Sequence, residues 1–151
     1  MEFPFSSAVV SVHAHATEDE QRVLEIMKEL LPLSAEIRKS SMKGHHGNPI
    51  LDFEARISQK KVLKELWRGI LSRMSEETFS ALRSTVQERI DDSCFLYLRF
   101  DKQAAIEDEL VLTDTGDAIH MRFKVVAFPA QRDVAVERVI NFLEAGRKHE
   151  A

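Results

Sequence analysis

The clearest structural signal in the sequence is CFLYLRF, residues 94–100. Its even-numbered residues are all apolar, whereas the odd-numbered ones are Phe95, Tyr97 and Arg99. A period of two is typical of a β-strand that buries one face and leaves the other open. We therefore expect a sheet with one covered face and one open face, and we place Tyr97 and Arg99 on the open one.

Two strands are expected after this stretch. Residues 118–126 alternate apolar side chains with His120, Arg122 and Lys124. Together with residues 110–113 they predict a hairpin whose turn contains a Thr-Gly pair. The second hairpin strand therefore adds three side chains that can carry positive charge to the open face.

Three strands are expected before it. Residues 8–16 and residues 50–57 show the same alternation. Residues 35–43 form a weaker and more polar strand. This strand is a candidate for the edge of the sheet, where a second copy of the chain could pair with it in a homodimer.

Apolar residues at helical spacing follow three capping signals. Thr17, Ser58 and Ser75 each precede such a segment, and each is expected to cap a helix through its side-chain oxygen. A short helical turn is expected near residues 103–107, and the last helix over residues 133–143. Helices therefore alternate with strands along most of the chain.

The order βαββααβββα contains no run of parallel crossovers. It predicts an α+β fold with a mixed or antiparallel sheet and helices packed on one face. A chain of 151 residues with 44% hydrophobic content is of ordinary single-domain size. We expect residues 1–151 to form one domain.

The single cysteine and the N-terminus indicate the compartment. Cys94 cannot form an internal disulfide, and the sequence shows neither a secretory signal nor about 18 consecutive apolar residues. We expect a cytoplasmic protein that does not contact a membrane. No nucleophile with a base, metal-binding spacing or phosphate-binding loop is evident, so neither catalysis nor a cofactor or bound metal is expected.

The open face of the predicted sheet is basic and aromatic, although the net charge of the chain is −4. Its expected residues are His13, His15, Arg56, Phe95, Tyr97, Arg99, His120, Arg122 and Lys124. Such a surface suits single-stranded RNA, because bases stack on aromatic rings while cations meet the phosphates. The same pattern would also arise on an ordinary solvated face.

A glycine-rich turn, KGHHGNP at residues 43–49, is a second candidate contact. Its glycines allow a close approach of the backbone to a ligand, and Lys43, His45, His46 and Asn48 supply donors. A purely structural turn is equally compatible with this sequence. Metal binding is disfavoured, because adjacent histidines rarely reach one ion.

Three segments together resemble an archaeal family of RNA-binding proteins that are described as predicted exosome subunits. The segments are HHGNPI at residues 45–50, LDFE at residues 51–54 and LRFDKQA at residues 98–104. The resemblance implies a fold similar to that of the ribosomal protein that binds 5S RNA, and an RNA ligand, with a role in RNA processing. It also implies contacts from the turn and the Lys102 region, and exosome or ribosomal components as partners.

Two other functions remain open at this point. A protein-interaction subunit of an RNA-processing complex would use the same surface without touching RNA. A metal-dependent nuclease would need histidines to converge with carboxylates, for which His13, His15 or His120 with Asp52 or Glu54 are the candidates.

Overall fold

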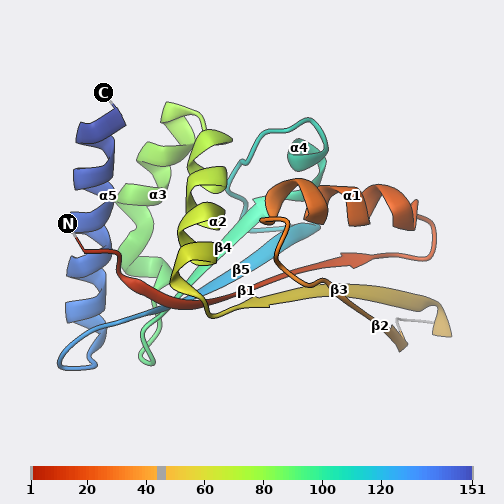
Figure 1. Cartoon of the computed structure of the whole chain (residues 1–151). Coiled ribbons are helices and arrows are strands. Elements are labelled where there is room, and N and C mark those ends of the chain that lie inside the picture. The colour runs from red at the N-terminus through yellow and green to blue at the C-terminus, as the bar shows by residue number, and fades with distance from the viewer. Residues whose placement is uncertain (1, 44–46, 151) are drawn as a thin grey trace.

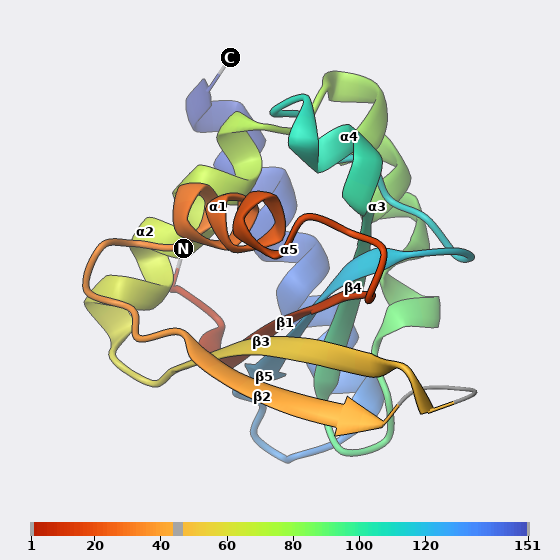
Figure 2. The same cartoon turned by 90° about the vertical axis from the view of Figure 1, so that its right-hand side faces the viewer.

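The computed structural model describes residues 2–43 and 47–150 and has one layer of helices on one face of a twisted sheet (Figure 1). The sheet has five strands in the order β2-β3-β1-β5-β4, and every neighbouring pair is antiparallel. Figure 2 shows β2 as the outermost strand on one side. The bounds of the strands are β1 Phe5–Ala14, β2 Arg38–Lys43, β3 Pro49–Ile57, β4 Phe95–Asp101 and β5 Ala118–Val125.

The helices start at side-chain caps in three cases. Asp19 accepts from the Gln21 amide, Ser75 from the Thr78 amide and Asp101 from the Ala104 amide. The prediction for Ser75 is confirmed. Those for Thr17 and Ser58 are wrong, because the first helix starts two residues later at Asp19 and the second follows Gln59, whose side chain makes no capping bond. The helix bounds are α1 Glu20–Leu30, α2 Lys60–Ser72, α3 Glu76–Arg89, α4 Lys102–Ile106 and α5 Arg132–Glu150.

The core lies between the helices and the covered face of the sheet. The covered face supplies alternate residues of β1, β3, β4 and β5, among them Phe53, Phe100 and Phe123, which are no more than 1% exposed. Phe5 and Trp67 meet Phe123 with ring centroids 5.0 and 5.5 Å away, so α2 is held against β1 and β5. Burying one face of each strand in this way leaves the other face as a continuous open surface.

The α+β class and the antiparallel sheet with helices on one face are confirmed. One predicted strand, residues 110–113, is absent, and the short helix α4 and a loop link β4 to β5 instead. The loop runs beside β4 rather than β5, since the Asp101 backbone amide donates to the Val111 carbonyl and the Thr113 amide donates to the Arg99 carbonyl. Both sides of β5 are already paired, with β1 and β4, so only the outer side of β4 is free to bind the loop.

No helix in residues 2–43 and 47–150 has both the length and the apolar character that crossing a membrane requires.

Candidate nucleic-acid interface

The register of the sheet brings the predicted basic and aromatic residues of four strands together on the open face. Val9 of β1 pairs with Arg56 on one side and with Arg122 on the other. Arg122 in turn lies directly opposite Tyr97 of β4. Three residues predicted from separate segments, Arg56, Arg122 and Tyr97, therefore form one row across the sheet.

A second row lies beside the first. Ser11 of β1 pairs with Glu54 of β3 and with His120 of β5, and His120 lies opposite Arg99 of β4. Because these residues are two positions along each strand from the first row, they point to the same face. Both rows belong to one surface that the helices do not cover.

The centre of this surface is a hollow with a volume of about 500 Å³. Its floor includes Val9 and Ser11, which are short side chains on the central strand. Its walls include longer side chains on the flanking strands, namely Glu54, Arg56, Tyr97, Arg99, His120 and Arg122. The hollow thus arises because small residues on β1 lie between large residues on β3, β5 and β4.

Positive charge on the open face is concentrated on β4 and β5. On β3, Arg56 is paired with Glu54 at 2.7 Å. On the other side, Arg99 donates to the Gly116 carbonyl at 3.1 Å and Lys124 to the Ser93 carbonyl at 2.6 Å, and neither acceptor carries a charge. The β3 side is therefore close to neutral, and the β4 and β5 side is basic.

Arg99, Arg122 and Lys124 form what we call the basic cluster. Arg122 and Lys124 lie over the ring of Phe95, 4.9 and 4.6 Å from its centroid. Within the described ranges, no member of the cluster forms an ion pair with a carboxylate. The cluster consequently presents three cations that an anionic ligand can neutralise.

Tyr97 is held in place by Asp91, a residue that precedes β4. The Tyr97 hydroxyl donates to Asp91 Oδ2 at 3.0 Å, and Asp91 Oδ1 accepts from the amides of Ser93 and Phe95. Burial and the Asp91 carboxylate raise the pKa of Tyr97, whereas Arg122 opposes the shift. Burial acts to raise the pKa of Asp91 as well, but its hydrogen bonds together outweigh burial and lower it. At neutral pH Asp91 is ionised and Tyr97 remains a donor.

His120 contributes hydrogen-bonding capacity rather than charge at neutral pH. Burial lowers its pKa, the positive charges of Arg99 and His13 lower it further, and Asp117 opposes them. A neutral imidazole offers one donor and one acceptor.

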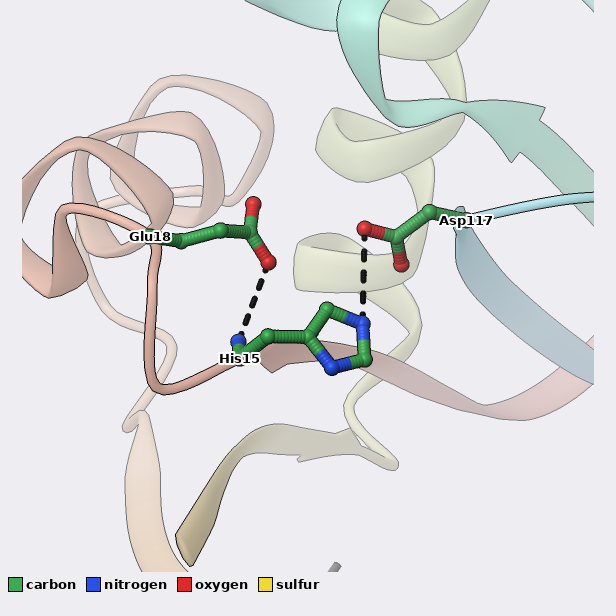
Figure 3. A group of neighbouring side chains, drawn as sticks. All are labelled: His15, Glu18 and Asp117. Carbon is green, nitrogen blue, oxygen red and sulfur yellow. Dashed lines mark hydrogen bonds and ion pairs between the residues drawn. The ribbon is translucent and has the colours of Figure 1, made fainter. Parts of the chain in front are cut away.

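The histidines expected to share the face fall into two groups. His13 lies on the open face with its Nδ1 atom 3.5 Å from Asp52 Oδ1. His15 lies beyond the end of β1, where its Nε2 atom is 3.6 Å from Asp117 Oδ2 and its amide donates to Glu18 (Figure 3). The two therefore contact different carboxylates.

Lys102 is not on the open face, although the sequence placed it among the RNA contacts. Its side chain is buried, and its ammonium group donates to the His13 carbonyl at 2.6 Å, to Glu18 at 2.8 Å and to Asp117 at 2.9 Å. All three of its donors are used inside the protein. We therefore remove Lys102 from the candidate interface.

The group His15, Glu18 and Asp117 has three ligand atoms within 4.8 Å of one another, which is a spacing that a metal ion could use (Figure 3). The Lys102 ammonium already binds both carboxylates. A cation would have to displace this buried lysine, so the arrangement favours a structural ion-pair cluster.

The described ends of the glycine-rich turn, residues 43 and 47–49, lie away from the hollow. Lys43 and Asn48 are exposed at its two ends, Gly47 has a φ of +76°, and His45 and His46 lie outside the described residues. Four strand spacings of about 4.8 Å separate β2 from β4 and three separate β3 from β4, so the two ends of the turn are roughly 19 and 14 Å from the strand that carries Tyr97. A ligand that contacts both would have to cross the sheet.

Sequence reasoning missed two features of this surface. Asp91 was not considered, although an aspartate that precedes a strand often accepts from the amide two residues later, as Asp91 does from Ser93. The hollow was also missed, because the short side chains of Val9 and Ser11 indicate a hollow only when the longer side chains across the sheet are known.

The chain is similar to known proteins that are described as RNA binding. A protein-family model described as RNA binding matches residues 7–125. The RNA-binding protein PAB1135 of Pyrococcus abyssi is 33% identical over 135 residues, which cover 86% of this chain and 88% of that protein.

Solved structures show the same architecture. Protein AF2318 of Archaeoglobus fulgidus is 33% identical, with a TM-score of 0.81 over 92% of this chain and 99% of that one. Mth689 of Methanothermobacter thermautotrophicus is also 33% identical, with a TM-score of 0.79 over 93% of this chain and 99% of that one.

Proposed function

Because the chain belongs to the RNA-binding family, we propose that it is a non-catalytic protein that binds RNA through the open face of its sheet. The basic cluster is the main contact in this proposal. The glycine-rich turn with Lys43, His45, His46 and Asn48 is a second contact, as are His13 and Arg56. The protein would act in RNA processing, with exosome or ribosomal components as partners.

One observation carries this proposal: Arg99, Arg122 and Lys124 gather on two adjacent strands and form no ion pairs within the described residues. RNA phosphates bind such cations and release the counterions that surround the nucleic acid. The aromatic rings of Phe95 and Tyr97 lie on one of these strands, β4, and rings of this kind stack on bases. The combination suits RNA better than it suits a simple anion.

The net charge of −4 does not argue against this proposal. At physiological ionic strength, exposed charges more than about 8 Å apart are largely screened from one another. A ligand on the open face therefore responds mainly to the basic cluster, and only weakly to acidic residues on the helices.

The salt dependence of binding tests the proposal. The triple variant Arg99→Ala, Arg122→Ala and Lys124→Ala is compared with wild type in titrations of labelled single-stranded RNA at several salt concentrations. Each phosphate neutralised on a single strand contributes about 0.7 to the slope of log K against log salt concentration. We expect the triple variant to lower that slope by about 2 and to weaken binding.

A matched control carries the same loss of charge on the helical layer. Lys61→Ala, Arg68→Ala and Arg83→Ala remove one lysine and two arginines from exposed positions on α2 and α3. This variant should retain the slope of wild type. Equal slopes in all three proteins would contradict the assignment of RNA binding to the sheet face. If wild type does not bind RNA, the result would favour the protein-interaction alternative.

A further inference from the structure

We propose that the hollow holds one unpaired nucleobase, with Tyr97 as the ring on which the base stacks and Asp91 as the residue that positions Tyr97. This inference rests on the proposed RNA binding and specifies the kind of RNA. It predicts that the protein distinguishes single-stranded RNA from duplex RNA.

The Tyr97 ring is both accessible and held in position. It is 43% exposed in the middle of β4, where most large apolar side chains are buried. Its hydroxyl is tied to Asp91, and Asp91 is itself held by two backbone amides at 2.9 and 3.0 Å. A ring fixed before binding loses less conformational freedom when a base stacks on it.

The hollow beside the ring has the dimensions and the shape that a base requires. Its volume of about 500 Å³ falls within the range of about 300–1,000 Å³ that is usual for small-molecule sites. The short side chains of Val9 and Ser11 leave the space above β1 open. A base turned away from its neighbours can enter this space and still contact the ring on β4.

Polar groups in the hollow match the edge of a base. His120 offers a donor and an acceptor from its neutral ring, and the Ser11 hydroxyl offers both as well. RNA-binding proteins read unstacked bases through hydrogen bonds of this kind to the base edges. His120 and Ser11, which could bind the edge of a base, therefore line the same hollow as Tyr97, which could stack on the face of that base.

The charges assign the base to the hollow and the phosphates to its rim. On the β3 side of the hollow Glu54 is paired with Arg56, so this wall has no net positive charge to hold a phosphate. The basic cluster lies on the opposite side, over β4 and β5. A strand whose phosphates follow the basic cluster would thus direct a base toward β1.

Duplex RNA cannot use this site. Bases inside an A-form helix are stacked on both sides, and their edges in the deep, narrow groove are out of reach of side chains. Duplex RNA could still contact the basic cluster through its phosphates. The hollow therefore adds affinity for single strands alone.

The test compares affinities for a labelled single-stranded oligomer and for the duplex of the same sequence. In Tyr97→Leu, affinity for the single strand should fall by roughly 5- to 150-fold, the range that follows from one lost base–aromatic stack. Affinity for the duplex should stay within twofold of wild type, an order-of-magnitude limit for phosphate contacts that remain intact. Phe128→Leu removes a ring that is 86% exposed outside the hollow and should change neither affinity.

Asp91→Asn and Tyr97→Phe test the positioning role. Both keep a ring at position 97 but weaken or remove the bond that fixes it, so single-strand affinity should fall less than in Tyr97→Leu. Asp91→Asn should cause no further loss when it is combined with Tyr97→Leu. An unchanged thermal midpoint in Asp91→Asn would separate this role from a structural one.

Three outcomes distinguish this inference from the proposed function. Equal losses for single strand and duplex in Tyr97→Leu, or no loss, would overturn the base site. If the basic-cluster variant still binds RNA more weakly than wild type in that case, the proposed RNA-binding function stands without the base site. A selective loss for the single strand supports the base site. Failure of wild type to bind either RNA would overturn both.

Discussion

His120 shows how a single side chain on the open face responds to its surroundings. Burial first, and then the charges of Arg99 and His13, lower its pKa in the folded protein below the value near 6.5 that an unfolded chain would have. The unfolded chain therefore takes up this proton more readily than the folded protein. The contribution of neutral His120 to stability is present above about pH 6.5 and is lost as the pH falls through the folded-state pKa.

The variant His120→Asn tests this sign, because asparagine is polar but does not titrate. Between about pH 7.5 and pH 5.5, an interval that spans the ordinary histidine pKa, the free energy of unfolding should fall less in the variant than in wild type. Urea unfolding at both pH values measures the difference. An identical pH dependence in the two proteins would contradict the lowered pKa of His120.

At the scale of elements, Lys102 joins the end of β1 and the residues before α1 to the start of β5. It is the first residue of α4, and its ammonium group binds the end of β1 through the His13 carbonyl. It also binds Glu18 before α1 and Asp117 before β5. Lys102 is 3% exposed and therefore shielded from water, whereas the Glu18 and Asp117 side chains are 30% and 40% exposed.

Replacing this lysine should loosen all three segments. Lys102→Met keeps a long apolar stem but leaves Glu18, Asp117 and the His13 carbonyl without their donor. Since one hydrogen bond to a charged group is worth about 1.5–3 kcal/mol, we expect the free energy of unfolding to fall by about 2–3 kcal/mol in urea.

Lys39→Met provides the control for this prediction. Lys39 pairs with Glu20, but both side chains are well exposed. Exposed ion pairs contribute about 0–1 kcal/mol, so this variant should lose less than about 1 kcal/mol. Equal losses in the two variants would show that Lys102 has no special structural role.

At the scale of the whole molecule, the sheet has two different borders. The outer side of β4 binds part of the loop before β5, whereas β2 pairs with β3 alone and all six of its residues are exposed. An open edge of this kind can pair with another chain. Three of the six residues of β2, however, are basic: Arg38, Lys39 and Lys43. Such charges disfavour pairing between two copies of the edge.

We expect the chain to sediment as a monomer at micromolar concentrations. Replacing Arg38, Lys39 and Lys43 by threonine removes the charges and keeps a residue that favours strands. This variant should self-associate in sedimentation-velocity experiments. A wild type that is already dimeric would instead support the homodimer that the polar edge suggested from sequence.

Element positions followed closely from local patterns. The predicted strands at residues 50–57, 94–100 and 118–126 correspond to Pro49–Ile57, Phe95–Asp101 and Ala118–Val125. The errors concern details that depend on neighbours. Thr17 and Asp19 are both good caps, and Glu18 between them is bound to Lys102, a partner 84 residues away.

The candidate site was predictable as a set of residues but not as a shape. Alternation alone placed Tyr97, Arg99, Arg122 and Lys124 on one face, and the structure keeps them there. The same argument misplaced His15, which follows the end of β1. It also gave no sign that Lys102, a lysine, would be buried.

Membership of a face is a local property, because successive side chains of a strand point to opposite sides whatever its partner is. The residues alone therefore established the fold class and the composition of the open surface. Strand order is not local, since the backbone groups that join strands are the same in every residue. Only long-range packing in the tertiary structure decides which strands lie beside β1. The hollow over Val9 and Ser11, the contact of Arg122 with Phe95 and the burial of Lys102 all depend on that packing.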